Sequence, residues 1–124
     1  MKFLNFSSDA PNFRVEDGSM VWDVTPWTFG NELTEIGLSR CFINFEKISS
    51  YRSLILSCSL VDENFANWNG IIASGTTRGK SFSFQPAILE FWKLDCTRPR
   101  NIIFTLKGIN AQNLNYVNIV LVVR

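Results

Sequence analysis

The sequence contains no histidine, the side chain that most often serves as a general base and as a ligand for transition metals. Its three cysteines are scattered, and their spacing matches no zinc-binding pattern. It also has no Gly-x-Ser-x-Gly elbow for a serine nucleophile and no calcium loop built on regularly spaced aspartates. These absences predict a protein that is not an enzyme and that holds no metal or cofactor.

Two short stretches could still suggest catalysis or nucleotide binding. Glu32 and Glu35 form a carboxylate pair of the kind that glycosidases use, but such pairs more often belong to a solvated turn. The stretch GTTRGKS, residues 75–81, has three residues between its glycines, whereas a phosphate-binding loop has four and leads into a helix. The alternating residues 81–84 that follow predict a strand, so we interpret residues 75–80 as the tip of a hairpin joining residues 71–74 to 81–84.

The chain also lacks a strong excess of either charge and any long apolar run. Twelve basic and eleven acidic residues give a net charge of +1, which argues against a nucleic-acid-binding protein held by electrostatics. Residues 119–123 form the longest apolar run and are too few to span a membrane. The first residues do not resemble a signal peptide, and the odd number of cysteines argues against a disulfide framework. These features predict synthesis in a reducing cytosol.

What the chain does have is a high content of apolar and aromatic residues arranged with a period of two. Apolar residues make up 46% and aromatic residues 14% of its 124 residues, enough for one folded domain over residues 1–124. Alternation of apolar and polar side chains predicts about eight or nine short strands. The predicted strands are residues 2–6, 20–24, 41–46, 52–61, 70–74, 81–84, 87–95, 101–107 and 116–123. Their spacing indicates an all-β antiparallel β-sandwich, with a jelly roll as the first choice of topology.

Three local expectations follow from this pattern. Residues 41–46 and 52–61 predict a hairpin that places Cys41 opposite Cys58; packed free thiols and a disulfide are both open there, with free thiols favoured. The apolar residues 117–123 predict a central strand, since edge strands are normally interrupted by charge. A helical turn within residues 31–39 is also open, because Gly37 suits a helix C-terminus.

Two sets of loop residues are candidates for binding. The stretch DENFANWNG, residues 62–70, places aromatic rings beside amides, a combination that suits carbohydrate, although the same residues also suit the closed end of a sandwich. Its candidate ligand-binding residues are Asn64, Phe65, Asn67, Trp68 and Asn69. A second set of basic residues, expected at loop tips, would form a patch for an acidic partner or simply a solvated surface: Arg78, Lys80, Arg98 and Arg100.

The sequence thus favours a non-enzymatic structural or interaction subunit of a larger assembly. By analogy with other sandwich domains, the most specific form of this expectation is a component of a virus particle, such as a capsid, cement or receptor-binding fibre-head protein. We expect a homo-oligomer, with a trimer as the first choice, or contacts with neighbouring subunits. The alternative is a small carbohydrate-binding, lectin-like module that uses the 62–70 loop.

Overall fold

The computed structural model describes residues 2–24, 34–45, 52–61, 66–77, 81–94, 101–107 and 113–124. These residues form ten β-strands and no helix. The strands are β1 (Lys2–Ser7), β2 (Phe13–Glu16), β3 (Ser19–Asp23), β4 (Thr34–Phe45), β5 (Arg52–Val61), β6 (Ala66–Thr77), β7 (Ser81–Phe84), β8 (Trp92–Leu94), β9 (Asn101–Lys107) and β10 (Leu114–Val123).

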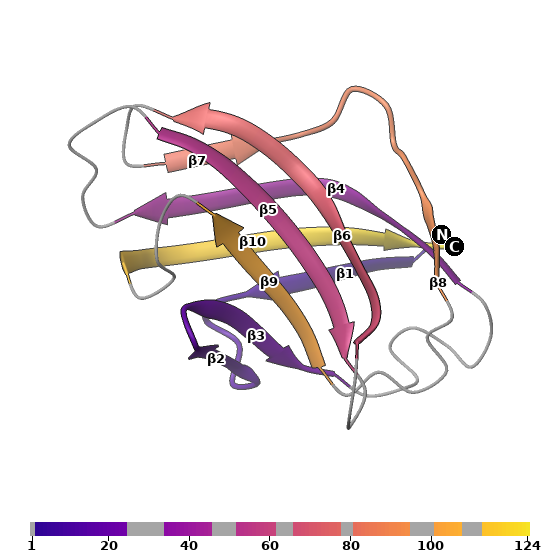
Figure 1. The fold of residues 1–124 in the computed structure, drawn as a ribbon, viewed down its shortest axis with the longest axis horizontal. Helices are drawn as coiled ribbons and strands as arrows, with labels where there is room; N and C mark the ends of the chain where they lie inside the picture. The colour runs from indigo at the N-terminus through magenta and orange to yellow at the C-terminus, as the bar shows by residue number, and fades with distance from the viewer. Residues whose placement is uncertain are drawn as a thin grey trace.

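The strands form two antiparallel sheets that face each other, so the prediction of an antiparallel β-sandwich is confirmed (Figure 1). The first sheet has the order β1-β10-β4-β7, and β8 also pairs with β4. The second sheet has the order β2-β3-β9-β5-β6. Strands from the two ends of the chain pair in succession: β1 with β10, β3 with β9, β4 with β7 and β8, and β5 with β6. This nested pairing, wrapped so that β10 joins β4 and β9 joins β5, is that of a jelly roll.

The core lies between the sheets because alternate side chains of each strand point inward. In β5, Leu54, Leu56 and Leu60 are almost completely buried, whereas the serines between them are half-buried or exposed. The largest fully buried side chains are Trp22, Phe45, Phe104, Met20, Ile36, Ile43, Leu54, Leu56, Leu60, Ile102 and Ile119.

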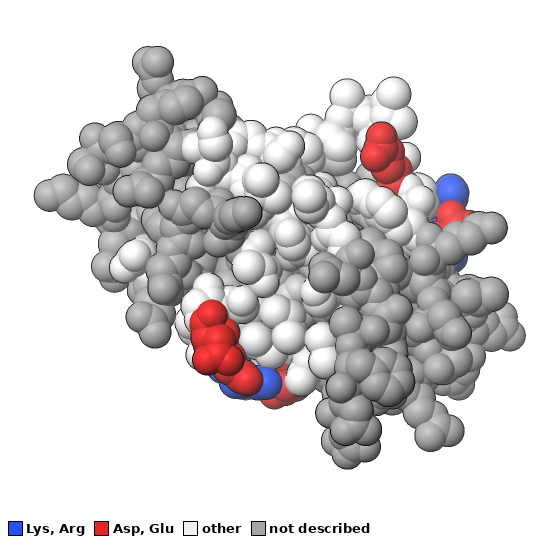
Figure 2. Space-filling model, in the orientation of Figure 1, with Lys and Arg blue, Asp and Glu red and all other residues white. Residues whose placement is uncertain are grey.

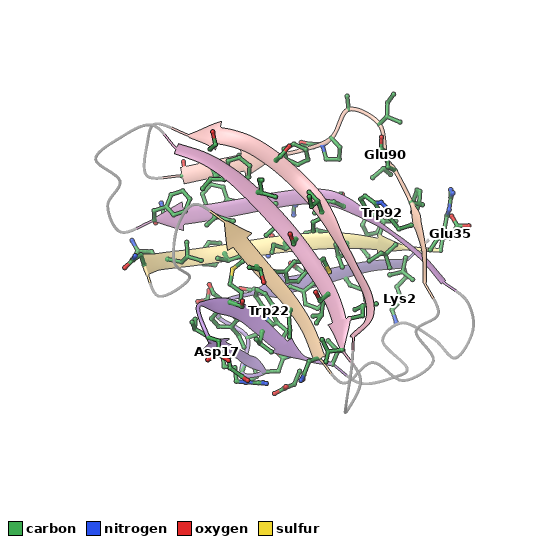
Figure 3. The ribbon with its side chains drawn as sticks, viewed as in Figure 1. Lys2, Asp17, Trp22, Glu35, Glu90 and Trp92 are labelled. Carbon is green, nitrogen blue, oxygen red and sulfur yellow. The ribbon has the colours of Figure 1, made fainter. Side chains whose placement is uncertain are left out.

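Trp22 occupies an aromatic cluster at one end of this core (Figure 3). Its ring packs edge-on against Phe6 and Phe104, with ring centroids 5.8 and 5.4 Å away, and tilted against Phe13 at 4.7 Å. Its indole N–H donates a hydrogen bond of 2.8 Å to the carbonyl oxygen of Ser7. The cluster therefore joins β1 of the first sheet to β2, β3 and β9 of the second.

The connection between β2 and β3 is a tight hairpin turn that the residue types dictate. Asp17 and Gly18 both have positive φ angles, 51° and 77°. A two-residue turn with positive φ at both positions matches the twist of the flanking strands, and Asp-Gly is one of its preferred sequences. The short edge strand β2, which this turn creates, is not among the strands that the sequence predicts.

The last strand lies inside the first sheet, as predicted. β10 pairs with β1 on one side and with β4 on the other, and its side chains from Val117 to Val123 are buried, with the exception of the half-buried Asn118. Lys2 is the register partner of Val123, so the two ends of the chain lie side by side (Figure 1). Arg124 continues the ladder by exchanging two backbone hydrogen bonds of 3.0 Å with Glu35.

The predicted hairpin of residues 41–46 and 52–61 is wrong. Cys41 lies in β4 of the first sheet and Cys58 in β5 of the second, so the chain changes sheet between these strands. Two strands can bury their apolar side chains either side by side in one sheet or opposite each other across the core, so the alternating pattern does not distinguish the two arrangements. Cys41 and Cys58 are free, buried thiols, which confirms the favoured prediction that they do not form a disulfide.

The predicted hairpin of residues 71–74 and 81–84 is also wrong. β6 is an edge strand of the second sheet and β7 pairs with β4 in the first. The two strands nevertheless come close, since a Cβ atom on Gly75 would lie 2.9 Å from the ring of Phe82. The chain therefore crosses from the second sheet to the first between β6 and β7. The two strands are in contact through the Phe82 side chain and do not pair by backbone hydrogen bonds.

Two smaller expectations also fail. Residues 34–39 belong to β4 and are extended, so they do not form a helical turn; residues 31–33 lie outside the described residues. Of the predicted strand 87–95, residue 95 lies outside the described residues; among residues 87–94 only Trp92–Leu94 pairs as a strand, and residues 85–91 form an irregular segment between β7 and β8.

Candidate binding surfaces

The structure brings none of the predicted site residues together as a described site. Asn64 and Phe65 lie outside the described residues, as do Arg78, Lys80, Arg98 and Arg100. Asn67, Trp68 and Asn69 belong to β6, where Asn69 is the register partner of Ser59 and Trp68 that of Leu60. Their backbone is therefore part of a strand, not of the turn that the sequence suggested. Carbohydrate binding by this stretch and binding of an acidic partner by the basic residues both stay predictions.

Glu35, one of the two carboxylates considered for catalysis, is tied to the end of β10. Its Oε2 accepts a hydrogen bond of 3.0 Å from Nη2 of Arg124 and one of 3.2 Å from Nε. The Arg124 guanidinium in turn lies 3.7 Å from the ring centre of Phe91. Glu35 thus holds the C-terminal residue Arg124 against β4, close to the ends of the chain (Figure 3). Glu32 lies outside the described residues.

An apolar groove opens between the edge strand β6 and the irregular segment 85–91. It has a volume of about 280 Å³. Its lining residues are Leu38, Ile71, Ile72, Ser74, Phe84, Pro86, Ile88, Glu90 and Trp92. Leu38 and Ile72 belong to the core, so the floor of the groove is continuous with the interior of the sandwich. We call this feature the edge groove.

The rim of the edge groove exposes aliphatic side chains to solvent. Ile71 is 62% exposed on β6, and Ile88 is 78% exposed on the opposite side. Leu89, next to Ile88, is 40% exposed. Glu90 supplies the one charged side chain of the lining (Figure 3). A rim of this kind offers apolar contact area to a partner, and its one charged residue does little to select between acidic and basic partners.

The described outward-facing side chains of β5 and β9, on the outer face of the second sheet, are uncharged. Figure 2 shows that the described charged residues on this side of the molecule lie near its periphery. The centre is formed by small hydroxyl and aliphatic side chains that point outward from β5 and β9: Ser53, Ile55, Ser57, Ser59, Val61, Ile103 and Thr105. We call this surface the uncharged face.

A second depression lies on the outer face of the first sheet, where β4 runs between β10 and β7. It has a volume of about 370 Å³ and is lined by Arg40, Cys41, Phe42, Ser83, Gln85, Tyr116 and Asn118. The register explains the grouping, because Phe42 is the partner of both Asn118 and Ser83. Direct cross-strand partners lie on one face, so three strands contribute one polar and aromatic row. We call this feature the sheet depression.

Hydrogen bonds and ring contacts order the sheet depression and its surroundings. The side-chain amide of Asn118 donates to Oδ1 of Asn5 at 2.5 Å, and that of Asn115 donates to Oδ1 of Asn44 at 3.3 Å. The rings of Phe42 and Tyr116 have their centroids 6.3 Å apart and an interplanar angle of 50°. This site could not be predicted from the sequence because it depends on the pairing of β4 with β10, which are separated by more than half the length of the chain.

Three side chains have pKa values that shift for clear causes. Hydrogen bonds raise the pKa of the Arg14 guanidinium: the larger contribution comes from Asp23, whose Oδ1 lies 2.6 Å from Nη1, and the smaller from Glu16. Burial raises the pKa of the Cys41 thiol to about 12, and that of Cys58 further still. A buried thiol with a raised pKa is a poor nucleophile, so these cysteines belong to the core and not to a reactive site.

Within the described ranges, no group of three or more acidic, cysteine or histidine residues is placed to hold a metal ion. No helix in the same ranges is long and apolar enough to cross a membrane. Comparison with known proteins adds no relative: no family model, no curated protein and no solved structure matches this chain. The geometry of the described surfaces is therefore the basis for a functional proposal.

Proposed function

We propose that the chain is a non-enzymatic interaction subunit that joins other subunits in a larger assembly. The observation that carries this proposal is the edge groove, whose rim holds Ile71 and Ile88 at 62% and 78% exposure above a floor of core residues. Burying one such side chain against a partner contributes about 1.5–3 kcal/mol. A cluster of these residues at one place is a common mark of a protein–protein contact.

The uncharged face supports the same proposal. It lies on the sheet whose edge strand, β6, forms one wall of the edge groove. Charged groups oppose burial because their desolvation is costly, and interface cores are accordingly depleted in them. A partner that covers the groove could therefore extend over the described side chains of the uncharged face without stripping water from a charge.

A second copy of this chain is the partner that we propose. The net charge of +1 means that copies repel each other only weakly. We propose that the exposed aliphatic rim of one copy packs against a different surface of the next, in a head-to-tail contact. Head-to-tail contacts close into a ring when the rotation between copies is a whole fraction of a turn, and a trimer is the ring that we favour. A component of a virus particle, such as a capsid, cement or fibre-head protein, is the most specific form of the proposal, by analogy of fold.

Light scattering behind a sizing column tests the proposal through the mass of the chain in solution. We expect a trimer or a larger closed assembly that Ile71→Lys shifts toward the monomer, because a lysine would place a charge in the contact. Phe3→Lys is the matched control, since Phe3 is also 62% exposed but lies on β1 in the other sheet. A wild-type chain that stays monomeric at every concentration would contradict the proposal, as would equal effects of the two substitutions.

A further inference from the structure

We propose that the sheet depression binds a sugar acid, that is, a saccharide unit that carries a carboxylate. The site is separate from the edge groove and from the 62–70 loop, and the inference does not depend on assembly. Three features of the depression carry it: a guanidinium without a described partner, a pair of aromatic rings and a set of oriented amides.

The Arg40 guanidinium is the anion-binding group of this site. Three arginine side chains are described, and two of them are neutralised within the chain: Arg14 pairs with Glu16 and Asp23, and Arg124 with Glu35. Among the described residues no carboxylate pairs with Arg40, which is exposed at the wall of the depression. A guanidinium offers a planar fork of donors that matches a carboxylate with two parallel hydrogen bonds.

Phe42 and Tyr116 provide the surface for the apolar side of a sugar ring. Phe42 is 39% exposed on a strand whose other large apolar side chains are buried, and its ring lies 6.3 Å from that of Tyr116. Aromatic rings present a large, rigid apolar face, and the tyrosine adds a hydroxyl group that can form a hydrogen bond. Both rings line the same depression as Arg40.

Amide and hydroxyl groups complete the lining, and the amide of Asn118 is held by a hydrogen bond. The amide nitrogen of Asn118 donates a hydrogen bond of 2.5 Å to Asn5, which holds the side chain in place, and its Oδ1 is a group that can accept a hydrogen bond from a ligand hydroxyl. Gln85 and Ser83 stand on the β7 side and can both donate and accept. Groups held in place before binding lose little freedom when a ligand arrives, which favours affinity.

The position of the depression argues for a sugar and against an acidic peptide. Extended peptides bind most readily to a free sheet edge, where the backbone supplies hydrogen bonds. The β4 backbone beneath the depression is already paired on both sides, with β10 and with β7. Only side chains are available there, in a volume of about 370 Å³ that lies in the range of small-ligand sites.

Nuclear magnetic resonance titration of the full chain tests this inference and detects weak binding. The probes are oligosaccharides ending in a sialic or a glucuronic acid, the neutral oligosaccharides that lack this unit, and oligoglutamate. We expect shifts centred on Tyr116 and Asn118 and a preference of about tenfold or more for the acidic sugars, since hydrogen bonds to a charged group are about twice as strong as neutral ones.

Matched variants distinguish the proposed site from general attraction of anions. Arg40→Gln should remove the preference for acidic over neutral sugars, and Phe42→Ala should weaken binding of both. Arg14→Gln, on the other sheet, is the control and should bind as the wild type does. Circular dichroism shows that each variant is folded. Absence of binding by every acidic sugar would overturn the inference; so would unchanged binding by Arg40→Gln, or binding of oligoglutamate as tight as that of the sugars.

Discussion

Cys41 and Cys58 show how strongly the sandwich core acts on a single ionisable side chain. One thiol lies in each sheet, and both are at most 1% exposed. Burial disfavours the thiolate, which raises the pKa of Cys41 from 9.0 to about 12 and that of Cys58 further. Because the folded chain retains protons that the unfolded chain releases, the two thiols couple stability to alkaline pH.

We expect the free energy of unfolding to fall as the pH rises above the ordinary thiol pKa of 9.0. The contribution of the protonated thiols is complete below that pH and is lost as the pH rises toward about 12. Each thiol contributes a slope of about 1.4 kcal/mol per pH unit in this window. Urea unfolding at a series of alkaline pH values measures it. Cys58→Ala should lower the dependence of the unfolding free energy on pH by the contribution of one thiol. If the variant and the wild type show the same dependence on pH, this explanation is wrong.

At the scale of the elements, the segment that precedes β8 lies directly on β4. Gly37 is the position where they meet: a Cβ atom there would lie 2.6 Å from the carbonyl oxygen of Glu90 and 3.5 Å from the ring of Phe91. The carbonyl is a backbone atom, so it cannot turn aside as a side chain could. Glycine at this position is thus a condition for the close approach of the 85–91 segment to the first sheet.

Gly37→Ala should therefore destabilise the fold by about 1–3 kcal/mol, the usual cost of forcing extra atoms into a packed site. Urea or thermal unfolding measures the change. Ser39→Ala in the same strand serves as the control, since it removes an oxygen and adds no atom; we expect it to stay within about 0.5 kcal/mol of the wild type. If the two variants unfold alike, the contact with Glu90 does not constrain the segment.

The elements themselves were largely predictable from the sequence, but their partners were not. Period-two alternation identified most strands because one face of each is buried, and the apolar run at residues 117–123 correctly placed β10 inside a sheet. The hairpins predicted across residues 47–51 and 75–80 were wrong, because a short connection is equally compatible with a change of sheet. The β2 strand was missed because its four residues carry too little pattern.

At the scale of the whole molecule, six of the eight ladders between described strands join strands that are not consecutive in the chain. Residue Lys2 pairs with Val123, and Asp23 with Asn101. The sheet depression combines β4, β7 and β10 for the same reason, so no local motif could have indicated it. Its individual residues were visible in the sequence as outward-facing positions of strands, but only the register places Phe42 beside Asn118.

This topology also bears on folding speed. Pairing distant segments requires the closure of long loops before any contact is gained, and β-sandwiches accordingly refold in about milliseconds to seconds. We expect the same range here, with the fluorescence of the four tryptophans, among them the core residue Trp22, as the signal in a stopped-flow experiment. Refolding that is complete within microseconds would show that local contacts dominate and would contradict the nested pairing.

The side-by-side ends of the chain also determine how the molecule responds to mechanical force. β1 and β10 are antiparallel, and Lys2 and Val123 stand at the same end of their ladder. A pull on the two ends would load their hydrogen bonds one pair after another, as in opening a zipper, because antiparallel bonds run perpendicular to the strands. Resistance to stretching is thus low along this axis, and a load applied elsewhere on the sandwich would meet several ladders at once.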